Sequence, residues 1–299
     1  MSSLYFQTID ASIHVRTTQP TNKDNQRPLL VFIHYWGGSS STWHKLTTPN
    51  TPTSLTSEYP TLAIDLRGWG KSASPGAGDE GSCSINNMAS DVSSILSQIT
   101  TKPNHHQLLQ HGFVLVGHSM GAKVAMTSLV HLSKNLMDIL KGFVLVAPAP
   151  PAALDLPAEM KAQQQLAYES EESIRWTIAN VLANAENLTD YDTSLIVQNS
   201  LGGTSSAKKA WPSYGMQEDV SQQVAQVLDK CSGLRARVLV GEGDFVEPKE
   251  RVESEVVHFL EKHGVEVTLK TVAAVKHLIP LENPASICEE VYQLREGQN

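Results

Sequence analysis

The sequence predicts an α/β protein with a mostly parallel central sheet flanked by helices and with an inserted helical cap. Short apolar runs alternate with helix-like segments along most of the 299 residues, as is typical of parallel strands joined by helical crossovers. Between residues 148 and 227 this alternation stops, because a proline-rich exit is followed only by helix-like segments. We therefore expect a core formed by residues 1–147 and 228–299 and a cap, or lid, formed by residues 148–227.

The strand candidates are short, apolar runs in which Val, Ile, Leu and Phe follow one another. Such continuous runs indicate strands buried on both faces, as in a parallel sheet covered by helices. Near the N-terminus, segments 4–9 and 11–17 are expected to form a hairpin or edge pair. The remaining strands are predicted at residues 28–33, 59–65, 113–116, 142–147, 236–240 and 265–272.

The helix candidates carry apolar residues at helical spacing. The clearest stripe runs from Met88 to Ile99, with apolar side chains mostly three or four positions apart, so that they share one helix face. Polar stretches at 18–27 and 73–84, which contain proline or glycine, are predicted loops. Further helices are expected at residues 122–132, 247–262 and 284–294.

Composition narrows the class of protein. The formal net charge of -8 argues against nucleic-acid binding, and neither a bilayer-spanning apolar run nor a secretory signal is visible. Three widely spaced cysteines, Cys83, Cys231 and Cys288, fit neither a disulfide framework nor a metal cluster. We expect a cytoplasmic protein that acts on a small molecule, does not associate with membranes and needs no cofactor. The composition leaves the oligomeric state open.

A Gly-x-Ser-x-Gly pattern, residues 117–121, joins the strand predicted at 113–116 to a helix. A serine hydroxyl becomes a useful nucleophile only when it is exposed and a base can take its proton. A sharp turn between strand and helix exposes Ser119, and the start of the helix directs backbone N–H groups toward developing negative charge. The same pattern also fits an ordinary glycine-rich connection, so the rest of the chain must decide.

Several patterns resemble those of the α/β-hydrolase family and occur along nearly the whole chain in the family's order. They are the Gly117–Gly121 turn, His34-Tyr35-Trp36-Gly37-Gly38, Asp65-x-Arg67-Gly68-x-Gly70, the pair Gly243-Asp244 and His277-x-x-Pro280-x-Glu282-x-Pro284. The resemblance is to capped members, which include esterases, lactonases, carbon–carbon bond hydrolases and haloperoxidase-like enzymes. Epoxide hydrolases and dehalogenases of this branch use Asp at the elbow, so Ser119 argues against those two activities.

In this family the catalytic serine, acid and histidine follow one another along the chain, each after its own strand. Asp244 follows the strand at 236–240, and His277 follows the strand at 265–272. His277 is therefore predicted to accept the proton of Ser119, with Asp244 orienting the imidazole. Alternatives for the acid are Glu242 and Glu247, and Asp244 could be an ordinary turn residue.

The resemblance implies an oxyanion hole made by the N–H of Met120 and an N–H of the loop after the strand at 28–33. Many relatives have glycine where this chain has Tyr35, so either Tyr35 or Trp36 could supply the second N–H. His34, Trp36 and His118 are expected substrate contacts, although His34 could instead brace the loop.

Two other clusters of polar residues have simpler explanations than a binding site. The segment containing Asp65 and Arg67 is predicted to be a structural turn in which Arg67 pairs with a carboxylate, because it lacks the spacing of a phosphate loop. His105, His106 and His111 could suggest a metal site. Adjacent histidines cannot easily share one ion, and a solvated loop is expected there instead.

Together these patterns predict a cofactor-independent serine hydrolase that cleaves a small or medium-sized, largely apolar carboxylic ester or lactone through an acyl-enzyme. A hydrolase of carbon–carbon bonds in ketones could use the same residues, and so could a receptor-like protein that binds a ligand on the same fold. Amide hydrolysis is disfavoured, since the sequence shows no acidic anchor for a substrate amine.

Overall fold

The computed structural model describes residues 1–20, 26–72, 81–102 and 105–296. Its centre is an eight-stranded sheet in the order β1-β2-β4-β3-β5-β6-β7-β8. The first hairpin pairs antiparallel, β2 runs antiparallel to β4, and the remaining neighbours are parallel. The predicted α/β class and mostly parallel sheet are therefore confirmed. The strands are β1 (Ser2–Gln7), β2 (Ser12–Thr18), β3 (Leu29–Ile33), β4 (Thr61–Ile64), β5 (Phe113–His118), β6 (Leu140–Val146), β7 (Arg235–Gly241) and β8 (Glu266–Val272).

The central strands are buried on both faces, as their continuous apolar runs indicate, whereas β1 and β8 at the two edges of the sheet are largely exposed. In β3, Leu29 and Ile33 face one apolar core, whereas Leu30 and Phe32 face the other. All four side chains are fully buried. Successive side chains of a strand point to opposite faces, so a strand covered on both sides must be apolar at every position.

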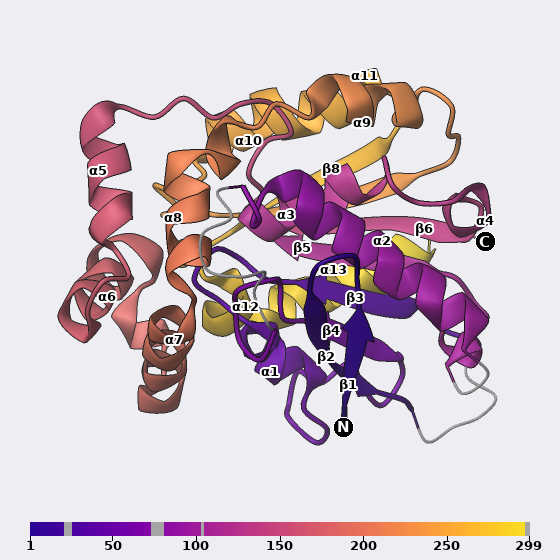
Figure 1. Cartoon of the computed structure of the whole chain (residues 1–299), viewed down its shortest axis with the longest axis horizontal. Helices are drawn as coiled ribbons and strands as arrows, with labels where there is room; N and C mark the ends of the chain where they lie inside the picture. The colour runs from indigo at the N-terminus through magenta and orange to yellow at the C-terminus, as the bar shows by residue number, and fades with distance from the viewer. Residues whose placement is uncertain (21–25, 73–80, 103–104, 297–299) are drawn as a thin grey trace.

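Helices form a layer on each face of the sheet (Figure 1). On one side α2 packs on α3, and on the other α13 packs on β6 and β7. The helix predicted at 247–262 is two α-helical segments joined by a π-helical turn at Glu253–Val257. The helices of the core are α1 (His44–Thr47), α2 (Ile85–Thr101), α3 (Met120–Ser128), α4 (Lys134–Met137), α10 (Lys249–Val252), α11 (His258–Lys262), α12 (Ile279–Glu282) and α13 (Pro284–Glu296).

The two predicted loops lie partly outside the described residues, at 21–25 and 73–80. Among the described residues, no helix combines the length and the apolar character needed to cross a bilayer.

The segment between β6 and β7, all of which the structure describes, contains helices and no strand. Four of its helices gather beyond one end of the sheet, and the fifth, α9, lies beside α11 over the core (Figure 1). Val224 and Leu228 of α9 are buried, and α9 contacts α3 of the core. The cap predicted at residues 148–227 includes most of α9 and stays a prediction. The five helices are α5 (Ala158–Leu166), α6 (Glu171–Thr177), α7 (Asp190–Gly202), α8 (Ser205–Ser213) and α9 (Ser221–Leu228).

Arg67 ties the turn after β4 to helix α2 and to the first hairpin. Its Nε and Nη2 each lie 2.7 Å from a carboxylate oxygen of Asp91, and Nη2 also donates to Asp10 at 2.9 Å. The side chains of Arg67 and Asp91 are both 3% exposed. The structural pairing expected for Arg67 is confirmed, and its two-pronged geometry matches a guanidinium facing a carboxylate.

We predict that Arg67→Ala lowers the free energy of unfolding by about 3–5 kcal/mol, because it leaves Asp91 buried and uncompensated. Urea denaturation followed by circular dichroism would measure the loss. The matched control is Lys134→Ala, since Lys134 is 86% exposed in its pair with Asp138 and such surface pairs contribute little. Equal stability of the two variants would contradict the structural role of Arg67.

Candidate active site

Ser119 occupies the sharp turn between β5 and α3. Its backbone has φ 55° and ψ −121°, a region that non-glycine residues rarely adopt and that costs about 1–3 kcal/mol. The surrounding structure holds this conformation, because the Ser119 N–H donates to the carbonyl of Val146 at 2.9 Å. Ser119 therefore lies in the turn between β5 and α3, outside both elements, and its side chain projects beyond the end of β5.

The two glycines of the turn permit close packing of α3 against the sheet. A Cβ at Gly121 would lie 2.4 Å from the carbonyl oxygen of Ile33 and 2.5 Å from that of His34. A Cβ at Gly117 would lie 2.6 Å from the Cα of Ala122. Real side chains do not tolerate such distances, so glycine is required at both positions for the start of α3 to pack on β3 and β5.

Asp244 and His277 form a buried pair at the ends of β7 and β8. The Nδ1 of His277 lies 2.8 Å from Oδ2 of Asp244. The other oxygen, Oδ1, accepts hydrogen bonds from the N–H groups of Val246 and Glu247, at 2.8 Å and 3.0 Å. The carboxylate is thus fixed by three donors, and it fixes the imidazole with Nδ1 toward the acid.

Electrostatics in this pair favour a protonated imidazole. Burial by itself lowers the pKa of His277, but the charge of Asp244 and its hydrogen bond outweigh burial, and Glu247 and Glu282 add to the effect. The net result is a pKa of His277 above its usual value. An imidazolium formed at this position would therefore be stabilised.

The two alternative acids do not bond to His277. Glu242 is exposed, and its carboxylate accepts from the N–H of Ala274 at 3.1 Å. Glu247 is buried but pairs with Arg251 at 2.9 Å. Asp244 is consequently the carboxylate that the fold directs at the histidine.

Ser119 and His277 both line one cavity of about 220 Å³. Most of its wall is apolar, and Leu154, Val181 and Trp211 come from the segment between β6 and β7. Among the described residues, neither Ser119 Oγ nor His277 Nε2 has a hydrogen-bond partner, so the two do not bond directly to each other in this structure. Catalytic hydrogen bonds are often long in ligand-free enzymes and shorten when substrate binds.

Three backbone N–H groups near Ser119 are unpaired among the described residues: those of Met120, Tyr35 and Trp36. Met120 is the first residue of α3, where N–H groups lack intrahelical acceptors. Tyr35 and Trp36 follow β3 and line the cavity. These three positions are the ones that the sequence predicted for an oxyanion hole.

Trp36 connects this loop to α8. Its indole Nε1 donates to the carbonyl oxygens of Lys208 at 3.1 Å and Ala207 at 3.3 Å, both in α8. Within an α-helix the carbonyl of residue 208 would accept from the N–H of residue 212, but Pro212 has none. Because Pro212 has no N–H, the carbonyl of Lys208 has no intrahelical donor, and the Trp36 indole donates to it instead. The hydroxyl of Tyr168 in turn donates to the backbone carbonyl of Trp36 at 2.9 Å.

His34 and His118 do not contact the cavity, which corrects the expectation that they bind substrate. Both are fully buried. His34 Nε2 accepts from the N–H of Leu66 at 3.0 Å, and burial lowers the pKa of His34 to about 4. His118 Nε2 lies 2.9 Å from the carbonyl oxygen of His277, and burial lowers its pKa well below the usual value. Both rings are neutral and support the loops behind the cavity.

Two charged residues near the cavity were not anticipated in these roles. Glu247, which the sequence offered only as an alternative catalytic acid, lines the cavity without bonding to His277. Lys123 is fully buried in α3, and its Nζ donates to the carbonyls of Ala152 at 3.0 Å and Met216 at 3.4 Å, near the two ends of the cap. The sequence signal for this role was a lysine between the apolar residues Ala122 and Val124 in a predicted helix. A lysine buried there requires a hydrogen-bond or charge partner.

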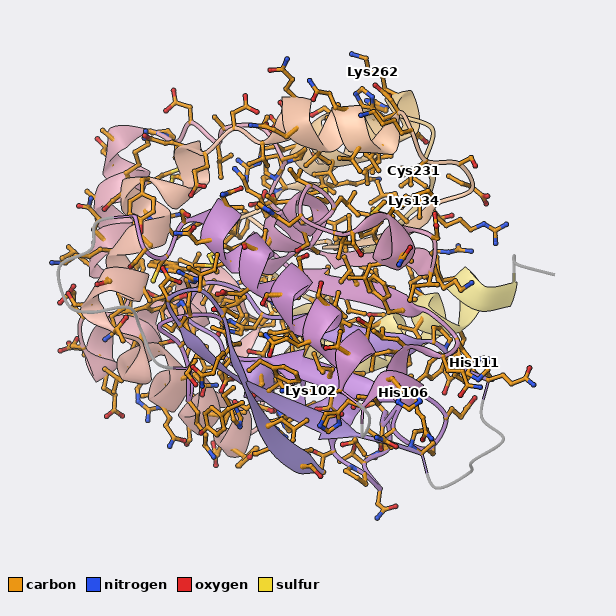
Figure 2. The ribbon with its side chains drawn as sticks, turned by 45° about the vertical axis from the view of Figure 1, so that its right-hand side comes forward. Lys102, His106, His111, Lys134, Cys231 and Lys262 are labelled. Atoms are coloured by element: carbon orange, nitrogen blue, oxygen red, sulfur yellow. The ribbon has the colours of Figure 1, made fainter. Side chains whose placement is uncertain are left out.

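Among the described residues, no group of three His, Cys, Asp or Glu side chains is arranged to hold a metal ion. Figure 2 shows His106 and His111 on the side of the molecule away from the cap helices. They belong to the connection that leads into β5, at the edge of the sheet opposite Ser119.

Comparison with known proteins places this geometry in a family. "Probable lysophospholipase BODYGUARD 1" from Arabidopsis thaliana is 32% identical over 137 residues, which are 46% of this chain and 26% of that protein. The chain thus spans about a quarter of the length of this curated relative.

Solved esterase structures share the whole fold at low identity. Esterase RhEst1 from Rhodococcus sp. ECU1013 is 20% identical with a TM-score of 0.74, and a thermophilic esterase from Thermogutta terrifontis is 20% identical with a TM-score of 0.70. Each comparison covers 100% of both chains. The model of the alpha/beta hydrolase family matches residues 30–290. The chain therefore belongs to the alpha/beta hydrolase family.

Proposed function

We propose that this protein is a serine hydrolase that cleaves a small or medium-sized, largely apolar carboxylic ester or lactone. The observation that carries the proposal is the placement of Ser119 at a strained turn in the same apolar cavity as His277, which Asp244 holds by a 2.8 Å hydrogen bond. A nucleophile, a base and an orienting acid are the parts that acyl transfer requires.

In the proposed reaction, Ser119 Oγ attacks the ester carbonyl carbon while His277 Nε2 accepts the hydroxyl proton. The N–H of Met120 and that of Tyr35 or Trp36 stabilise the negative oxygen of the tetrahedral intermediate. His277 then gives its proton to the departing alkoxide, which leaves an acyl-Ser119. A water molecule, deprotonated by His277, attacks the acyl group, and the proton returns to Ser119 as the acid is released.

The relatives and the cavity support an ester substrate. The structural neighbours described above are named as esterases, and the plant relative as a probable lysophospholipase. An apolar wall favours an apolar acyl or alcohol group, and a cavity of about 220 Å³ limits its size. We propose that the segment between β6 and α9 is the lid that forms this wall, with Trp36 and Lys123 anchoring it.

We predict that Ser119→Ala abolishes hydrolysis of 4-nitrophenyl butyrate and labelling by a fluorophosphonate probe. The nucleophile would be absent while the fold is retained, because alanine removes only one oxygen atom. Ser128→Ala is the matched control, since the Ser128 hydroxyl donates within α3 to the carbonyl of Val124 at 2.8 Å. Persistent turnover by Ser119→Ala would contradict the proposed function, and a single stoichiometric turnover by the unchanged protein would favour a receptor-like role.

We predict that kcat/KM falls as the pH drops through a midpoint above about 6.5, the usual pKa of histidine. Neutral His277 is the active base. Burial lowers its pKa, but Asp244 outweighs burial, and Glu247 and Glu282 raise the pKa further. Asp244→Asn removes the negative charge that raises the pKa of His277 most strongly, so the midpoint of the pH–rate profile moves to lower pH. The same change lowers kcat about 10⁴-fold. A pH–rate profile would measure both changes.

The control for the acid is Glu242→Gln. Its carboxylate bonds to the N–H of Ala274 and not to His277, so the pH–rate profile and kcat are expected to stay unchanged. A large loss in Glu242→Gln with little loss in Asp244→Asn would overturn the assignment of Asp244.

A further inference from the structure

Glu247 is a carboxylate in the cavity wall that the proposed mechanism does not use. It is 1% exposed and lies in the loop between β7 and α10. Its backbone N–H donates to Asp244, so the loop that fixes the catalytic acid also fixes Glu247. Both Glu247 and His277 line the cavity. The side chain therefore stands at a defined position beside the reacting groups.

Only one of its two carboxylate oxygens is paired. Oε2 accepts from Nη2 of Arg251 at 2.9 Å and from its Nε at 3.2 Å. Among the described residues, Oε1 has no hydrogen-bond partner. A carboxylate oxygen without a donor in a mostly apolar wall can accept a hydrogen bond from a ligand in the cavity. The cavity is therefore suited to a ligand that supplies the missing donor.

The charge at this site favours a neutral donor over a cation. Arg251 already balances the charge of Glu247, and an ammonium group placed on Oε1 would also approach that guanidinium. Burial raises the pKa of Glu247 to about 7, with Arg251 and His277 opposing the rise and Asp244 adding to it. A hydroxyl group can donate to the ionised carboxylate and accept from the protonated one, so it fits both forms near neutral pH.

A second polar atom in the same wall is also unsatisfied. Oε1 of Gln164, in α5, is buried and has no partner among the described residues. Gln164 lines the cavity with Glu247. Two acceptor oxygens without donors, in a wall that is mostly apolar, indicate that the natural ligand is not a plain hydrocarbon chain.

We propose that Glu247 is a specificity-determining residue whose Oε1 accepts a hydrogen bond from a hydroxyl group of the substrate. The preferred substrate is then a hydroxylated, otherwise apolar ester or lactone. This inference rests on the proposed hydrolase function. Discrimination can be large, because a site built to bond a hydroxyl rejects the analogue that lacks it more strongly than an apolar pocket rejects a hydroxyl.

The test compares esters that differ only in one polar group. Ethyl hexanoate is paired with ethyl 3-hydroxyhexanoate and ethyl 6-hydroxyhexanoate, and butyl hexanoate with 4-hydroxybutyl hexanoate, while ethyl 6-aminohexanoate tests a cation. Hydrolysis is followed in a pH-stat. We expect the best hydroxy ester to exceed its parent at least tenfold in kcat/KM. In Glu247→Met the ratio of kcat/KM between the hydroxy ester and its parent should approach one. In Glu247→Gln part of the preference for the hydroxy ester should remain, because the amide oxygen still accepts a hydrogen bond.

The matched control is Thr177→Val, another polar residue of the cavity wall. Its hydroxyl already donates to the carbonyl of Ser173 at 2.8 Å, so the ratio of kcat/KM should not change. Three results would overturn the inference: no hydroxy ester preferred over its parent, a preference for the amino ester, or an equal loss for all esters in both Glu247 variants. The last result would mean that Glu247 only supports the Asp244 loop.

The two proposals fail in different ways. If Ser119 reacts with a fluorophosphonate and simple esters are hydrolysed but the ratio stays near one, only the role of Glu247 is wrong. If Ser119→Ala hydrolyses the panel as well as the unchanged protein does, the proposed serine hydrolase function itself is wrong.

Discussion

The buried hydrogen bond between Asp244 and His277 is the interaction on which the arrangement of the candidate site depends. It forms because β7 and β8 are parallel neighbours, so the loops after both strands leave the same edge of the sheet. The parallel order places Ser119 after β5 and Trp36 after β3 at that edge as well. Side chains that follow the carboxyl ends of parallel strands therefore meet at this edge although they are far apart in the sequence.

The segment between β6 and β7 is bonded to the core near this edge by polar contacts with specific partners. Lys123 and the Trp36 indole each donate to backbone carbonyls of the segment between β6 and β7. Such groups are costly to bury unpaired, so these hydrogen bonds fix the position of this segment more specifically than apolar packing alone would. The proline of α8 takes part directly, because it frees the carbonyl that Trp36 uses.

Local patterns were sufficient to predict much of the framework. The predicted strands agree with those of the structure to within a few residues. Apolar runs marked the central strands, since a strand buried on both faces must be apolar throughout, whereas β1 and β8 are largely exposed. Gly117 and Gly121 marked the turn that carries Ser119. Chain order placed the acid after the strand at 236–240 but left Glu242 and Glu247 open, and the hydrogen bond of Asp244 to His277 separates them in the structure. The apolar stripe of α9 did not specify which neighbour would cover it, and the structure shows that this helix contacts α3.

By itself the sequence determined the class of fold, the strained serine turn and the pairing of Arg67, because each follows from short-range patterns or from the cost of burying a charge. Only the tertiary structure decided that His34 and His118 lie behind the cavity and that Glu247 lies in its wall. Those positions depend on how distant loops pack over one sheet edge. The burial and partners of a side chain are set by neighbours far away in the chain, which no local pattern encodes.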